Sequence, residues 1–101
     1  MKHDNDIAVR DGEFRLAIHQ THNCEAEALE CVVHVFIPRR NGAPWKGKVH
    51  VFGVTGHPNA TRCYAWPESL GKTAIMVRAV LHSDRISSPE KAVRSVLRRV
   101  P

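Results

Sequence analysis

The sequence predicts a small α+β domain with two layers, an antiparallel meander of about five strands packed by one C-terminal amphipathic helix. Two observations predict this fold class. The tetrapeptide Val-His-Val-Phe occurs at residues 33–36 and again at 49–52, on either side of a segment rich in Pro, Gly and Arg. Apolar residues alternate along most of the chain and switch to helical spacing over 87–100, and strands followed by such a helix are typical of α+β domains.

The length of 101 residues fits one domain with a single core. Residues 1–12 mix acidic and basic side chains with few apolar ones, so we expect a flexible lead-in there, followed by one α+β domain over 13–101.

The first strand is expected over 13–19, where Phe14, Leu16 and Ile18 alternate with polar residues. Residues 23–30 fit either a short helix capped by Asn23 or an extended segment, and we favour a strand or bulge. The β-branched run 31–37 predicts the next strand, which Pro38 ends.

The two Val-His-Val-Phe copies predict a long antiparallel hairpin, because the Asn-Gly pair at 41–42 suits a turn. If the numbers of paired residues sum to an even value, the valines of both copies share one face of the sheet. The other face then carries the remaining side chains, His34, Phe36, His50 and Phe52.

Two further strands are expected over 60–66, ended by Pro67, and over 73–82, with a turn at 68–72 between them. The final helix is predicted over 87–100, where Ser87 and Glu90 have capping-box spacing and Pro89 suits the first turn. Its apolar stripe is Ala92, Val93, Val96, Leu97 and Val100. Its polar face is basic and carries Lys91, Arg94, Arg98 and Arg99.

Charge is distributed unevenly along the chain. Residues 1–70 hold eight basic and eight acidic side chains, whereas residues 71–101 hold seven basic and two acidic ones, which accounts for the net charge of +5. A basic balance of this kind favours a polyanionic partner such as nucleic acid.

The basic hairpin tip is the candidate nucleic-acid-binding site. It comprises Arg39, Arg40, Trp45, Lys46 and Lys48, with no acidic residue between positions 38 and 48. Its cations suit phosphates, and Trp45 is open to two interpretations: the indole stacks on an unpaired base, or it folds back over the sheet as hydrophobic cover. The basic helix face of Lys91, Arg94 and Arg98 extends this candidate.

The sheet face that carries His34, Phe36, His50 and Phe52 is the candidate protein-interaction face. One C-terminal helix covers only one face of a five-strand sheet. We expect the second face to be covered by residues 23–30 with the N-terminal arm, by another protein, or by a second copy of the chain in a homodimer. Barrel-like curling of the sheet is the alternative.

Metal and catalytic signatures are incomplete. His19, His22 and Cys24 offer zinc-type ligands within six residues, but a second short-spaced ligand pair is absent, so no metal or other cofactor is assigned. Cys63 with His57 is the nearest approach to a nucleophile and base, and the alternation around Cys63 places it in the core instead. No catalytic residue is assigned.

Three cysteines, an odd number, with no secretory leader and no long apolar run predict a cytoplasmic chain with free thiols that does not enter a membrane. The leading hypothesis is a small, non-enzymatic interaction module that binds itself or another protein through the sheet face. A nucleic-acid-binding domain is the first alternative, and a small metal-binding domain is the second.

Overall fold

The computed structural model describes residues 11–40, 42–69 and 75–98. They form helix α1 (Asp11–His22), strands β1 (Glu25–Ile37), β2 (Trp45–Thr55), β3 (Arg62–Ser69) and β4 (Ile75–Leu81), and helix α2 (Pro89–Leu97). The strands make one antiparallel sheet in the order β1-β2-β3-β4. The α+β class, the antiparallel meander and the C-terminal amphipathic helix are therefore confirmed.

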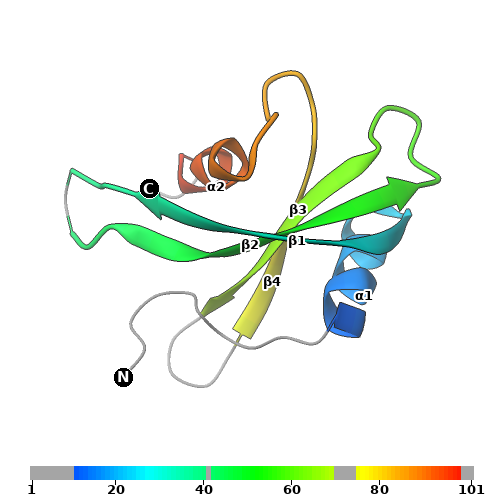
Figure 1. The fold of residues 1–101 in the computed structure, drawn as a ribbon, viewed down its shortest axis with the longest axis horizontal. Helices are drawn as coiled ribbons and strands as arrows, with labels where there is room; N and C mark the ends of the chain where they lie inside the picture. The colour runs from blue at the N-terminus through cyan, green and yellow to red at the C-terminus, as the bar shows by residue number, and fades with distance from the viewer. Residues whose placement is uncertain (1–10, 41, 70–74, 99–101) are drawn as a thin grey trace.

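The two helices lie on opposite faces of the sheet (Figure 1). Helix α2 packs over β1 and β2, where its buried Ala92, Val93 and Val96 meet a cluster that includes both tryptophans. Helix α1 covers part of the other face through Phe14 and Ile18. Within the described residues, the segment that covers part of this second face is thus α1, residues 11–22, and not residues 23–30, most of which lie in the sheet as the start of β1.

The prediction of a strand over 13–19 is wrong, because those residues belong to α1. Phe14 and Ile18 are one helical turn apart and buried, whereas Leu16 between them is 56% exposed. A pair at i and i+4 with one exposed apolar residue between them imitates strand alternation. Asn23 ends the helix in the left-handed region, with φ of 54°, and its N–H donates to the His19 carbonyl at 2.8 Å.

The expected strand or bulge at 23–30 is confirmed. β1 begins at Glu25, and its register against β2 shifts between Ala28 and Cys31. From Cys31 onward the paired numbers sum to an even value, as in Val33 opposite Val49, so the predicted register is confirmed. The valines of both copies lie on the α2 face.

Pro67 does not end β3, which continues to Ser69 and pairs with β4 throughout. It ends the pairing with β2 instead, whose last partner in β3 is Ala65 opposite His50. The backbone N–H and C=O groups of residues 63, 65 and 67 point toward β2. The missing N–H of Pro67 therefore removes a hydrogen-bond donor on the β2 side alone. Beyond this point the β1–β2 hairpin continues as a two-stranded ribbon.

The start of α2 also differs from the prediction. Ser88, not Ser87, caps the helix, because its hydroxyl accepts from the Lys91 N–H at 3.2 Å. Glu90 therefore has no capping-box position and instead accepts from Arg94. The exposed basic face and the buried apolar stripe agree with the prediction over the described residues.

The predicted lead-in at 1–12 is described only at its last two residues, which open α1, and the remainder lies outside the described residues. The same holds for most of the turn expected at 68–72 and for Arg99 and Val100.

Candidate nucleic-acid interface

Four arginines from two distant segments line one hollow on the α2 side of the hairpin tip. Arg39 and Arg40 follow β1, and Arg94 and Arg98 lie at the end of α2. The hollow has a volume of about 320 Å3, and its other lining residues are Ile37, Pro38 and Leu97. No acidic side chain is among the lining residues.

The fold brings these segments together through the α2 stripe. Val96 of that stripe belongs to the same buried cluster as Ile37 and Trp45, which pair with each other where the hairpin ribbon ends. Leu97 also packs against this cluster, so the last turn of the helix lies beside the tip. Pro38 ends β1, and Gly42, with φ of 95°, supplies the left-handed residue of the turn.

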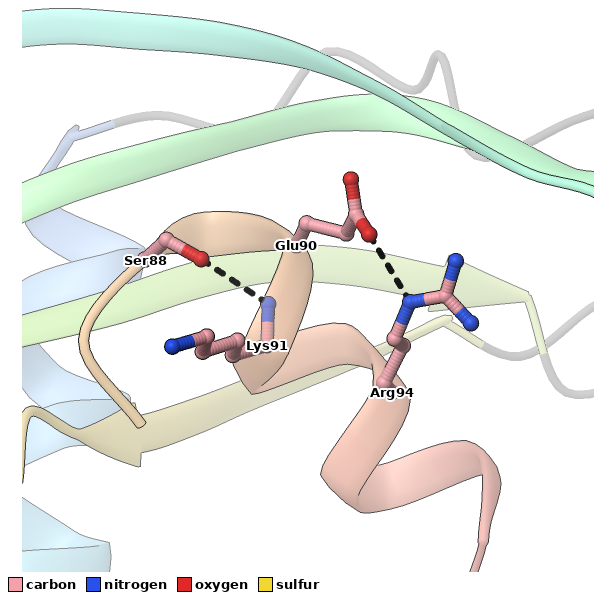
Figure 2. A network of polar contacts seen from close by, with 4 residues as sticks. All are labelled: Ser88, Glu90, Lys91 and Arg94. Atoms are coloured by element: carbon pink, nitrogen blue, oxygen red, sulfur yellow. Dashed lines mark hydrogen bonds and ion pairs between the residues drawn. The ribbon is translucent and has the colours of Figure 1, made fainter. Parts of the chain in front are cut away.

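Glu90 is the acid that interacts with this group. Its Oε2 accepts from Arg94 Nε at 2.8 Å, one helical turn away, as Figure 2 shows. That bond uses only Nε, so the two terminal nitrogens of Arg94 keep their donors for a ligand. In the described part of the chain, neither Arg39 nor Arg40 forms an ion pair.

The position of Arg94 and Arg98 at the carboxyl end of α2 is favourable for cations, because the negative end of the helix dipole lies there. The fold thus places Arg94 and Arg98 near Arg39 and Arg40, and no acidic side chain is among the residues that line the hollow. Such an arrangement attracts an anion with several oxygens, since guanidinium groups bind phosphate in a bidentate way.

The tip residues named from the sequence do not all join this hollow. Trp45 is buried at 7% exposure and packs edge-on against Trp66, with ring centroids 6.2 Å apart. Its interpretation as hydrophobic cover is confirmed, and its interpretation as a base-stacking side chain is wrong. Lys46 and Lys48 pair with Phe36 and His34 and lie on the opposite face.

The predicted protein-interaction face is divided by α1. Phe52 is buried at 1% exposure, and the His50 ring lies 4.5 Å from the Phe14 ring, centroid to centroid. His34 and Phe36 are exposed, with Phe36 at 56%. Among the described residues, His34 and Phe36 lie on the part of this face that α1 leaves uncovered, and the prediction of self-association stays a prediction.

The residues considered for a metal have other contacts. His19 Nδ1 lies 3.3 Å from Glu25 Oε2, His22 Nε2 bonds the Ala79 carbonyl oxygen at 2.8 Å, and Cys24 is in the core. The described residues contain no cluster of three or more His, Cys, Asp or Glu side chains able to hold a metal ion. The metal hypothesis gains no support from them.

Cys63 is fully buried, and burial, followed by the neighbouring Cys24, raises its pKa to about 12. The thiol is protonated at neutral pH and lacks the nucleophilic thiolate form. His57 uses Nδ1 to accept from the backbone N–H groups of Asn59 and Ala60, both at 3.1 Å. These two residues therefore do not form a nucleophile and base pair.

A second hollow, of about 420 Å3, lies where α1 meets the start of β1. Arg15 lines it together with Glu25 and Glu27, and the remaining lining residues are Ala26, Gly53 and Thr55. Its mixed charge selects no single class of ligand.

No protein-family model, curated protein or solved structure matches this chain. Among the described residues, no helix has both the length and the apolar character needed to cross a membrane. The functional assignment rests on the geometry and charge of the arginine hollow.

Proposed function

We propose that this chain is a non-enzymatic nucleic-acid-binding domain that holds the phosphate backbone in the arginine hollow. The observation that carries the proposal is the convergence of Arg39, Arg40, Arg94 and Arg98 around one volume of about 320 Å3. Residues 40 and 94 are far apart in sequence, so only the folded chain concentrates these charges.

The chemistry of the hollow favours phosphate over bases. Arginine donors match phosphate oxygens, whereas the described residues that line the hollow include no aromatic ring on which a base could stack. Contacts of this kind fix the position of a nucleic acid without reading its sequence. We expect binding with little sequence preference and strong dependence on salt.

Fluorescence anisotropy with a labelled single-stranded oligonucleotide tests this proposal. If all four arginines neutralise phosphates, the association constant falls on the order of 50-fold between 50 and 200 mM salt, from a slope of about −0.7 per phosphate. A duplex of the same length is the comparison. Absence of binding at 50 mM salt, or binding that is insensitive to salt, overturns the proposal.

A matched pair of variants locates the site. The double variant Arg39→Ala, Arg40→Ala is expected to weaken binding at least tenfold. It should also make the slope of the log association constant against log salt concentration less steep by about 1.4. Arg62→Ala is the single-site control, because Arg62 is exposed and pairs with Gly53, near the end of the sheet away from the tip. Equal losses per charge at both places would indicate diffuse attraction instead of a site.

Glu90→Gln provides a test in the opposite direction. Replacing this carboxylate by an amide removes one unit of opposing charge beside the hollow and leaves an oxygen that can still accept from Arg94 Nε. We expect the affinity for the oligonucleotide to rise by about two- to fivefold at low salt, since a nearby opposite charge at high dielectric is worth about 1 kcal/mol or less. Weaker binding would mean that Glu90 serves the site by holding Arg94 in place.

The thiols support a reducing location such as the cytoplasm. Cys24, Cys31 and Cys63 are all free, and Cys31 is exposed. Free exposed thiols persist in reducing compartments.

A further inference from the structure

The outer edges of the sheet are covered by helix α1 at two points. β1 and β4 are the outer strands. Arg15 Nε donates to the Ala26 carbonyl of β1 at 2.8 Å, and His22 Nε2 bonds the Ala79 carbonyl of β4 at 2.8 Å. Proteins cover open edges in this way because an unpaired strand recruits other strands.

The register shows which groups point outward from β1. The Val54 N–H donates toward β3, to the Thr61 carbonyl, so Ala26 opposite Val54 directs its backbone away from β2. The bulge between Ala28 and Cys31 then interrupts the ladder. The amino-terminal half of the β1 edge is therefore blocked by Arg15 and distorted by the bulge.

Within the described residues, the carboxyl-terminal half of the β1 edge, residues 31–37, is neither covered by a side chain of α1 nor interrupted by a bulge. Cys31, Val33, Val35 and Ile37 pair with β2 in the regular register, so Val32, His34 and Phe36 direct their N–H and C=O groups outward. The side chains of the same three residues are exposed, with Val32 at 45% and Phe36 at 56%. Open backbone and exposed apolar side chains thus coincide.

We propose that a second copy of this chain pairs with this edge, antiparallel, with His34 on the two-fold axis. In that register Val32 lies opposite Phe36 of the second copy, and each such pair exchanges both N–H···O bonds. Every outward group of the three residues is then paired. The exposed Val32 and Phe36 side chains meet across the axis, on the face of the sheet away from the arginine hollow.

The charge of β1 selects the antiparallel arrangement of two copies. Its amino-terminal half carries Glu25 and Glu27, whereas His34 lies in the other half and Arg39 and Arg40 follow the strand. In antiparallel pairing the acidic half of one copy lies opposite the basic half of the other. Parallel pairing would place halves of like charge opposite each other. A closed two-fold dimer follows, and its interface of three paired residues in each copy predicts a weak association.

Sedimentation measurements up to about 1 mM protein test the dimer. The expected result is a rise from 11.3 kDa toward twice that mass. His34→Pro removes an outward N–H without affecting the β1–β2 ladder, and Phe36→Lys leaves the backbone intact; each should weaken association at least tenfold. Leu16→Ser is the control, because Leu16 is also 56% exposed but lies on α1, and it should change association less than twofold.

A cross-link tests the register. In a Cys31→Ser background, His34→Cys places two thiols across the axis, where Cα atoms lie about 5.5 Å apart, within the disulfide range of about 4.4 to 6.8 Å. We expect rapid oxidation to a covalent dimer, whereas Cys31 in the unaltered chain lies opposite Ile37 and should cross-link slowly.

Two outcomes overturn the proposal. One is a chain that stays at 11.3 kDa at all concentrations, which would leave the edge to a strand of another protein. The other is Cys31 cross-linking faster than His34→Cys, which would exclude this register. Neither outcome bears on oligonucleotide binding by Arg39 and Arg40, so the two proposals fail separately.

Discussion

The two faces of the sheet are packed in different ways. Under α2, Trp45 and Trp66 fill the space between helix and sheet together with valines. Under α1, Phe14 and Ile18 pack against Phe52 and Val54 of β2 and against a set of small side chains, which are Cys24, Ala26, Ala60, Cys63 and Ala65. Burial of large rings contributes more free energy than burial of small side chains. We therefore expect the α2 face to contribute more to the stability of the whole domain than the α1 face.

The largest expected effect comes from Trp66→Ala. Trp66 has 0% exposure and contacts Trp45, so its truncation leaves a large cavity. We expect a loss of about 3–5 kcal/mol of unfolding free energy, enough to unfold much of the protein. Urea denaturation, followed by circular dichroism, measures this loss of unfolding free energy. Phe36→Ala, an exposed aromatic, is the control and should cost less than about 1 kcal/mol.

Phe14→Ala tests whether the α1 face is a local unit. Phe14 is 1% exposed and contacts Phe52 and His50. We expect about 3 kcal/mol to be lost from the protection of α1 amides, with much less lost in β2 and β3. Hydrogen exchange measured by NMR reports the protection of the α1 amides and of the β2 and β3 amides separately, and Leu16→Ala is the control. If protection falls equally everywhere, the two faces form one cooperative unit.

Alkaline pH provides a smaller effect on the α1 face. Burial raises the pKa of Cys63 from 9.0 to about 12. The folded state holds the proton more tightly than the unfolded state, so stability is intact below pH 9 and falls as pH rises toward 12. The expected slope is about 1.4 kcal/mol per pH unit.

Urea denaturation between pH 8 and 11 measures this slope. Cys63→Ala should reduce it, whereas Cys31→Ala, at an exposed thiol, should leave it unchanged. Burial also raises the pKa of Cys24 and of Tyr64, so both groups are expected to contribute to the slope that remains in Cys63→Ala. A slope that Cys63→Ala does not alter would contradict the buried state of this thiol.

Ser88→Ala gives the smallest effect. It removes the hydroxyl that accepts from the Lys91 N–H and should cost about 1 kcal/mol. Ser87→Ala is the matched control, because within the described residues the Ser87 hydroxyl bonds the exposed Lys91 side chain and not a helix N–H. Its loss should cost less than about 0.5 kcal/mol. A larger loss from Ser87→Ala than from Ser88→Ala would place the cap at Ser87, as the capping-box spacing suggests. Thermal denaturation distinguishes the two variants.

Much of the sheet was predictable because its signals are local. The repeated tetrapeptide, Pro38 and the turn at 42 specify the hairpin and its register, and both are observed. Helix α1 was not predicted, because three alternating apolar residues imitate a strand. Its composition contains the missed signal: between 11 and 22 only Ile18 and Thr21 are β-branched, whereas strands are enriched in such residues.

The candidate site was predictable only in part. Arg39 and Arg40 stand out in the sequence, and Arg94 and Arg98 follow from helical spacing, but their meeting depends on how α2 packs along the ribbon. The burial of Trp45 could not be decided from sequence, since it depends on the edge-on contact with Trp66. The open half of the β1 edge requires the order of the strands, which alternation alone does not give.

Pro67 has a mechanical consequence for the arginine hollow. Because it ends the pairing of β2 with β3, the strand residues from Trp45 to Val49 pair with β1 and with no described residue of β3. Two-stranded ribbons twist and bend more readily than wide sheets. We therefore expect the packing of α2 on this ribbon to set the width of the hollow.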